Sequence, residues 1–158
     1  TTEIYTLSLH DALPISLLRE VLTLYESAAL RIRLQVAEDL PPVLGDASQI
    51  RQIIHNMLQN AQDAVAGQED GEITLIIRRD GDRVLMVFRD NGPGFPAEVL
   101  ARAFEPYFTT KSKGTGLGLA MVKKIVAEHG GDVRVANRDV GGAEVRIRLR
   151  TLITSGEH

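Results

Sequence analysis

The sequence contains no cysteine, no run of lysine or arginine longer than two residues, and no long apolar run. Without cysteine the chain has neither a disulfide framework nor a thiolate metal site, which fits a reducing compartment. A formal net charge of -3 without a basic cluster argues against an electrostatic nucleic-acid footprint. No segment approaches the roughly 20 apolar residues that cross a bilayer. We therefore expect a cytoplasmic domain without a nucleic-acid partner or direct membrane contact; any anchor of a full-length protein would lie outside this fragment.

The 158 residues, of which 44% are hydrophobic, are enough for one domain with a real core. The first 16 residues are predicted to be a non-native tail. Thr1–Ile15 can be read as the translation of a common high-throughput sequencing adapter, and Ser16 is compatible with the next adapter base. We therefore expect the folded domain to comprise residues 17–152, followed by a tail at 153–158.

The rest of the sequence alternates helical and strand patterns, without internal repeats or low-complexity linkers. Asp80-Gly81-Asp82 is a strong hairpin signal, since Asp-Gly tolerates the positive φ angles of tight turns. The arginines that alternate with apolar residues in the last strand are expected on a solvated sheet face or edge. The predicted order begins with a helix at 17–25, a strand at 30–36, and a helix capped by Asp46 or Ser48 and extending to Val65. Strands at 72–79 and 83–90 follow, then a helical turn at 97–100 and an irregular segment. A helix ending near His129 and strands at 132–136 and 143–150 complete the order. This order indicates one α/β domain.

The first candidate site lies on the predicted helix that ends near Val65. At 100° per residue, Asn56, Asn60 and Asp63 fall together along one edge of its apolar stripe. Asparagine is a mediocre helix former, so two of them stacked in mid-helix need a reason. One interpretation is a solvated helix flank. The other uses the amide oxygens as hard ligands for Mg²⁺, which shares its coordination shell with substrate phosphates.

The second candidate site is Asp90-Asn91-Gly92-Pro93-Gly94, at the end of a predicted strand. Its glycines let the backbone pass close to a planar ligand, and Asp90 can accept a hydrogen bond from the amino group of adenine. Such a sequence on its own is more often a simple turn. Its position between the other two motifs favours the adenine interpretation.

The third candidate site is a glycine-rich start of a helix, preceded by hydroxyls and cations. Free amides and the positive end of a helix dipole suit nucleotide phosphates. A P-loop and a Rossmann turn are both excluded, because the final Gly-Lys-Ser/Thr is missing and an irregular segment precedes the motif instead of a strand. The residues are Thr109, Thr110, Lys111, Lys113, Gly114, Thr115, Gly116, Leu117 and Gly118, and the helix is expected to bury Leu117, Leu119, Ala120, Val122, Ile125 and Val126.

From about Leu17 to Arg150 the chain resembles the catalytic and ATP-binding domain of sensor histidine kinases, especially the nitrogen-regulation type, within the GHKL superfamily. The most specific stretch runs from Glu105–Lys111 through Gly114–Ala120 to Gly130-Gly131. The resemblance implies a Bergerat-type α/β fold, a two-layer sandwich. Its mixed, mostly antiparallel sheet is covered on one face by helices, with ATP held between two helices under a mobile lid.

The resemblance also implies roles for the motif residues. Asn60, with Asn56, would serve the Mg²⁺ site, and these two residues and Lys111 would be catalytic. Two departures from the family pattern bear on nucleotide affinity. Ala143 stands where relatives often have threonine. In the other, Ala64 stands where many relatives have an aromatic or larger residue, and Asp63 where they often have a basic one. The nucleotide-binding residues implied are Asn60, Asp63, Asp90, Gly92, Gly94, Phe104, Thr109, Thr110, Lys111, Lys113, Gly114, Thr115, Gly116, Leu117 and Gly118.

Three functions remain open at this point. Related GHKL ATPases use a glutamate four residues before the magnesium asparagine, where this chain has Asn56. Transfer to a histidine needs positioning more than water activation, so a histidine kinase is favoured over an ATPase and over a nucleotide-gated interaction module. The expected partners are a dimerisation domain with the phosphoaccepting histidine and a response regulator. His10 does not fill that role, because Pro14 follows it by four residues where the kinase box has five, and it lies in the tail.

Overall fold

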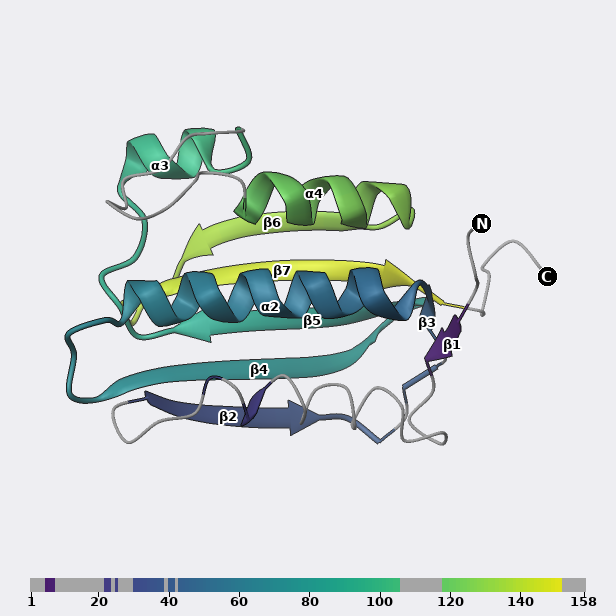
Figure 1. Cartoon of the computed structure of the whole chain (residues 1–158), viewed down its shortest axis with the longest axis horizontal. Helices are drawn as coiled ribbons and strands as arrows, with labels where there is room; N and C mark the ends of the chain where they lie inside the picture. Colours follow the sequence, from purple (N-terminus) through teal and green to yellow (C-terminus); the bar gives the residue numbers. More distant parts are fainter. Residues whose placement is uncertain are drawn as a thin grey trace.

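The computed structural model describes residues 5–7, 22–23, 25, 30–38, 40–41, 43–105 and 118–151. Its centre is a five-stranded sheet (Figure 1). Strand β2 pairs in parallel with β4, and every other neighbouring pair is antiparallel. The spatial order is β2 (Leu30–Val36), β4 (Gly71–Asp80), β5 (Arg83–Asp90), β7 (Ala143–Arg150) and β6 (Asp132–Asn137). The predicted α/β class and the five predicted strands are confirmed.

Two helices, α2 (Ala47–Ala64) and α4 (Gly118–Glu128), lie side by side on the same face of this sheet (Figure 1). A short helix, α3 (Ala97–Arg102), follows β5. The apolar stripe predicted for α2 faces the sheet, and every member is buried: Ile50, Ile53, Ile54, Met57, Leu58, Ala61 and Val65. The inward residues of the central strands complete the core: Ile73, Leu75, Ile77, Val84, Met86, Phe88, Val145, Ile147 and Leu149. The predicted layering of helices on one face is thus confirmed.

The two ends of the helix pair differ from the sequence expectation in detail. Asp46, not Ser48, caps α2, because its Oδ1 accepts the backbone N–H of Ser48 at 2.8 Å. Hydrogen bonds from the Ser48 side chain and backbone lower the pKa of Asp46. In α4, Val122, Ile125 and Val126 are buried as predicted. Leu119 and Ala120 are only partly buried, since both lie in the first turn of the helix.

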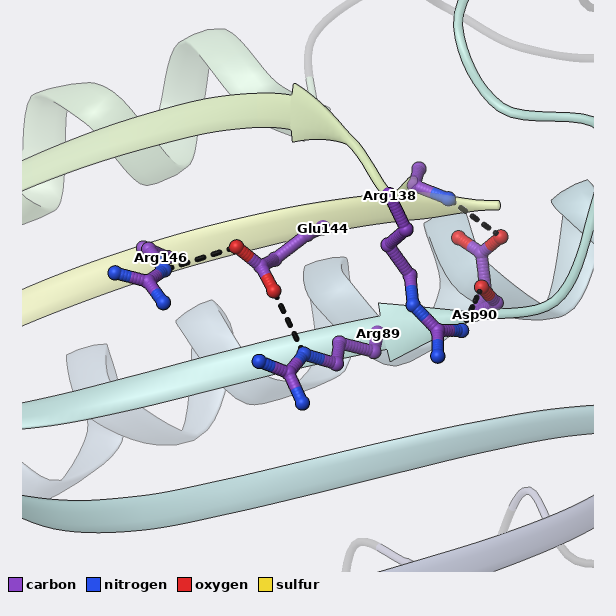
Figure 2. A network of polar contacts seen from close by, with 6 residues as sticks. Arg89, Asp90, Arg138, Glu144 and Arg146 are labelled. Carbon is purple, nitrogen blue, oxygen red and sulfur yellow. Dashed lines mark hydrogen bonds and ion pairs between the residues drawn. The ribbon is translucent and has the colours of Figure 1, made fainter. Parts of the chain in front are cut away.

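The opposite face of the sheet carries alternating charged residues, as predicted for its arginines. On this face Glu144 accepts hydrogen bonds from Arg89 at 2.6 Å and Arg146 at 2.9 Å (Figure 2). Burial raises the pKa of Glu144, but the hydrogen bonds from the two arginines outweigh it and leave the pKa lowered. Leu85 and Val87 lie on the same face and are nevertheless buried.

A second, two-stranded sheet pairs β1 (Tyr5–Leu7) with β3 (Val43–Gly45) in antiparallel register. Val43 also forms an isolated bridge with Thr151 beyond the end of β7. Neither short strand is predicted by the sequence: β1 lies within residues 1–16, which are predicted to be a non-native tail, and the three residues of β3 cannot show a clear alternation. Within the part of the chain that the structure describes, no helix combines the length and apolarity needed to cross a membrane.

Candidate functional site

The sheet register brings the end of β5 and the distant turn between β6 and β7 to one edge of the domain. Arg89 pairs with Glu144 across β5 and β7, and Asn137 pairs with Ala143 across β6 and β7. The end of β5, the end of β6 and the start of β7 therefore meet beside Asp90 (Figure 2). The C-terminal end of α2 reaches the same place, since a Cβ on Gly92 would lie 2.6 Å from the carbonyl oxygen of Ala64. The second predicted motif thus contacts the helix that carries the first.

Asp90 is a buried carboxylate held by the backbone, with 7% of its surface exposed. Its Oδ1 accepts the N–H of Gly92 at 2.9 Å and the N–H of Ala143 at 3.2 Å. Its main-chain carbonyl accepts a hydrogen bond from Arg138 Nη1 at 2.9 Å (Figure 2). These contacts fix the orientation of the carboxylate, so it can serve as a preorganised acceptor for a donor group on a ligand.

Asn91 anchors the motif on its other side. Its side-chain Oδ1 accepts the N–H of Glu72 at 2.8 Å, and its Nδ2 donates to the carbonyl of Asp70 at 2.8 Å. Gln68 Nε2 donates to the carbonyl of Asn91 at 3.2 Å. The side-chain amide of Asn91 therefore ties the segment after β5 to the residues on either side of the start of β4.

The two asparagines predicted as magnesium ligands lie on one flank of α2, as the helical spacing predicts. Both are partly buried, whereas Asp63 is exposed and accepts a hydrogen bond from Gln59 Nε2 at 3.1 Å. Asn56 Oδ1 accepts from Gln52 Nε2 at 3.0 Å. Its Nδ2 is buried and has no hydrogen-bond partner among the described residues. Such a buried donor suits a phosphate oxygen or a metal-bound water, and rotation of the amide about its terminal bond would present the oxygen instead.

Tyr25, in the segment before β2, contacts α2 beside this flank. Its hydroxyl lies 3.0 Å from Nδ1 of His55, the neighbour of Asn56. Burial raises the pKa of Tyr25, and the charge of Asp63 raises it further. The hydroxyl therefore stays protonated near neutral pH and can donate a hydrogen bond to His55.

Of the remaining predicted site residues, Phe104 and Gly118 are described by the structure and the others are not. Phe104 is partly buried, and Lys123 of α4 lies over its ring, 5.2 Å from the centroid. Gly118 is the first residue of α4 and is exposed. The other predicted phosphate-binding residues lie outside the described part of the chain: Thr109, Thr110, Lys111, Lys113, Gly114, Thr115, Gly116 and Leu117.

The sequence motifs do not indicate the contribution of the turn between β6 and β7. Arg138, Asn137 and the backbone of Ala143 all contact the segment Asp90–Phe95. The contact of Ala143 with Asp90 is made by its backbone N–H and needs no side-chain hydroxyl. The signal that could have revealed this turn is the pairing of β7 with β5, which is not a local pattern.

Residues 45–153 match the family described as histidine kinase-, DNA gyrase B- and HSP90-like ATPase. The chain belongs to this family. The family implies ATP binding, and the confirmed fold agrees with it.

Several named proteins are similar to this chain in sequence or structure. The chain is 47% identical over 104 residues to a protein of Rickettsia prowazekii named putative sensor histidine kinase NtrY-like; the match covers 66% of this chain and 17% of that protein. The solved catalytic domain of histidine kinase ThkA superposes with a TM-score of 0.80 at 30% identity, covering 94% of this chain and 96% of that one. ThkA solved in complex with response regulator protein TrrA gives a TM-score of 0.75 at 26% identity, covering 95% of this chain and 42% of that one. The chain thus spans less than a fifth of its NtrY-like relative.

Proposed function

We propose that this domain binds Mg-ATP and transfers the γ-phosphoryl group to a histidine on a separate dimerisation domain. The phosphoryl group would then pass to a response regulator in the cytoplasm. In the first step the imidazole nitrogen forms a bond to the γ-phosphorus, and the bond to the β–γ bridging oxygen breaks as ADP leaves. The proposal is supported by the relatives named as sensor histidine kinases and by the ThkA complex with its response regulator.

The observation that carries the choice of a kinase over a hydrolase is the identity of residue 56. ATPases of this family are expected to use a glutamate there as the base that takes a proton from water. Here the side chain is the amide of Asn56, which cannot accept a proton at neutral pH. Attack by an imidazole needs no such base, because the nitrogen lone pair is already available near neutral pH.

The proposed roles combine the contacts of the described side chains with the motifs of the sequence. Asp90 would accept a hydrogen bond from the amino group of adenine. The two backbone N–H groups that bind its Oδ1 hold the carboxylate in place for this contact. Asn60 and Asn56 would hold Mg²⁺ and its waters; the ion would neutralise charge on the phosphates. The buried Nδ2 of Asn56, which has no hydrogen-bond partner within the described part of the chain, fits a site of this kind. Lys111 and Lys113 would contact the phosphates, with Gly114–Gly118 supplying backbone amides.

A transfer experiment tests the proposal directly. The full chain is incubated with Mg²⁺, ATP labelled on the γ-phosphate, and a dimerisation domain carrying the histidine box of an NtrY-like kinase. We expect acid-labile, base-stable label on the dimerisation domain and none on this chain alone. The matched control is the dimerisation domain with its histidine replaced by alanine. Fast release of inorganic phosphate without any labelled protein would contradict the kinase and support the ATPase alternative.

The binding roles are tested separately from transfer. Asn60→Asp places a carboxylate close to the phosphates and is expected to abolish binding of Mg-ATP, as is Asp90→Asn. The measurement is titration calorimetry with Mg-ADP and Mg-ATP. Unchanged affinity in both variants would contradict the site assignment, even if phosphotransfer were observed.

A further inference from the structure

Asn137, the last residue of β6, makes an unusual double contact with the segment that follows Asp90. Its Oδ1 accepts the N–H of Phe95 at 2.7 Å, and its Nδ2 donates to the carbonyl of the same residue at 2.8 Å. The two residues are 42 positions apart in the sequence. Residues 91–96 belong to no helix or strand. The amide of Asn137 therefore does for Phe95 what a neighbouring strand would do for a residue within a sheet.

The contact fits closely against Gly94. This glycine has a φ of +82°, and a Cβ at its position would lie 2.9 Å from Asn137 Oδ1. A segment containing Gly92 and Gly94 has a large conformational freedom to lose when it is ordered. The two bonds from Asn137 restrict that freedom at the downstream end of the motif.

The upstream end of the motif is held by the same turn. Arg138 donates to the carbonyl of Asp90 at 2.9 Å, and Ala143 donates to its carboxylate at 3.2 Å. Arg138 N–H in turn donates to the carbonyl of Gly142 at 2.8 Å, which closes the turn between β6 and β7. One rigid hairpin turn therefore fixes both Asp90 and Phe95, with the glycines between them.

We propose that Asn137 is a positioning residue of the nucleotide site: it sets the Gly94–Phe95 backbone relative to Asp90 and so prepares the surface on which the base is read. This inference rests on the proposed nucleotide-binding function. Asn137 is exposed, so truncating its side chain opens no cavity in the core. Its loss should therefore act on the ordering of this segment more than on the stability of the fold.

The test compares Asn137→Ala with a matched control at the other end of the helix pair. His129 also makes two side-chain contacts with backbone, to the carbonyl of Ile125 at 2.8 Å and to the N–H of Asp46 at 3.1 Å. Both variants thus lose two hydrogen bonds, but only one of them faces the proposed site. Titration calorimetry with Mg-ADP and with Mg-GDP gives the affinity and the preference for adenine.

We expect Asn137→Ala to bind Mg-ADP about tenfold more weakly, because the nucleotide must then order the Gly94–Phe95 segment without the hydrogen bonds from Asn137. A tenfold loss corresponds to the net free energy of about one to two hydrogen bonds. The ratio of ADP to GDP affinity should fall as well, because a displaced backbone no longer discriminates between the two bases. His129→Ala should keep both the affinity and the ratio. A purely structural role of Asn137 would lower stability and leave the ratio unchanged.

Amide hydrogen exchange of the nucleotide-free wild-type chain provides a second measurement that needs no variant. The Phe95 amide should be protected although it lies outside regular structure, and Asn137→Ala should remove that protection. A Phe95 amide that exchanges as fast as an unstructured one in the wild type would overturn the proposal. So would an Asn137→Ala variant with unchanged ADP affinity and ADP to GDP ratio. If the wild type bound neither nucleotide, the proposed function would fail instead, and the exchange of Phe95 would still report on the contact.

Discussion

Two substitutions at Asp90 should separate its structural contribution from its proposed contribution to binding. Asp90→Asn retains an oxygen that can accept the N–H groups of Gly92 and Ala143, now 2.9 and 3.2 Å from Oδ1. It replaces the other carboxylate oxygen by an NH₂ group, which is a donor. Asp90→Ala removes both acceptors. The asparagine variant should therefore fold normally and fail in binding, whereas the alanine variant should lose stability too.

The magnitudes follow from the burial of the site. In Asp90→Ala, two backbone N–H groups next to a buried side chain lose their acceptor, which costs about 2–3 kcal/mol of the free energy of unfolding. Asp90→Asn exchanges a charged acceptor for a neutral one and should cost about 1 kcal/mol or less. For the nucleotide, Asp90→Asn loses a hydrogen bond to a charged group and sets a donor against the adenine amino group. An affinity loss on the order of 100-fold for Mg-ADP is expected.

Urea unfolding followed by circular dichroism gives the stability of the three proteins, and titration calorimetry with Mg-ADP gives their affinities. The reasoning would be refuted by an Asp90→Asn variant that binds Mg-ADP as tightly as the wild type, because the second oxygen would then have no role in adenine recognition. An Asp90→Ala variant with unchanged stability would show that the two backbone bonds contribute nothing. The wild type measured in the same buffers is the reference for both variants.

Three further substitutions test how the fold is held together. His129→Ala removes the acceptor of the Asp46 N–H and should lower the free energy of unfolding by about 1–2 kcal/mol in urea titrations; a change below about 0.3 kcal/mol would contradict this. Glu144 has a lowered pKa because its hydrogen bonds with Arg89 and Arg146 outweigh the effect of its burial. Its ionised form therefore stabilises the fold above its usual pKa of 4.5, and this contribution is lost as the pH falls through the lower folded pKa. Glu144→Gln should thus cost about 1 kcal/mol at pH 7 and progressively less below pH 4.5; a constant difference across that range would contradict the linkage. Leu58→Ala, at a fully buried position of α2, should cost about 2–5 kcal/mol and lower the urea midpoint without changing the slope.

The sequence predicts most of the fold because its strongest patterns are local and long. The apolar stripe of α2 runs from Ile50 to Val65, over about four turns. Strands β4 and β7 alternate buried and more exposed residues over most of their length, and β5 is a continuous apolar run between two charged ends. What it does not predict is short or depends on distant partners. Strands β1 and β3 have three residues each, and the capping choice between Asp46 and Ser48 depends on the backbone geometry at the start of the helix. The parallel pairing of β2 with β4 leaves no local signature either.

The candidate site divides in the same way, and the division has a physical cause. Asp90 and its glycines form a continuous motif, so their chemistry is visible in the sequence. The groups that fix Asp90 lie about 50 residues further on, because the antiparallel register of β5 with β7 carries the chain back to the same edge. A turn with Asn137 and Arg138 has no recognisable motif of its own, and its residues gain a role only when the register sets them beside Asp90. In this chain the residues proposed to contact the nucleotide are therefore easier to predict than the residues that hold them, and variants at the holding residues require a structure to propose.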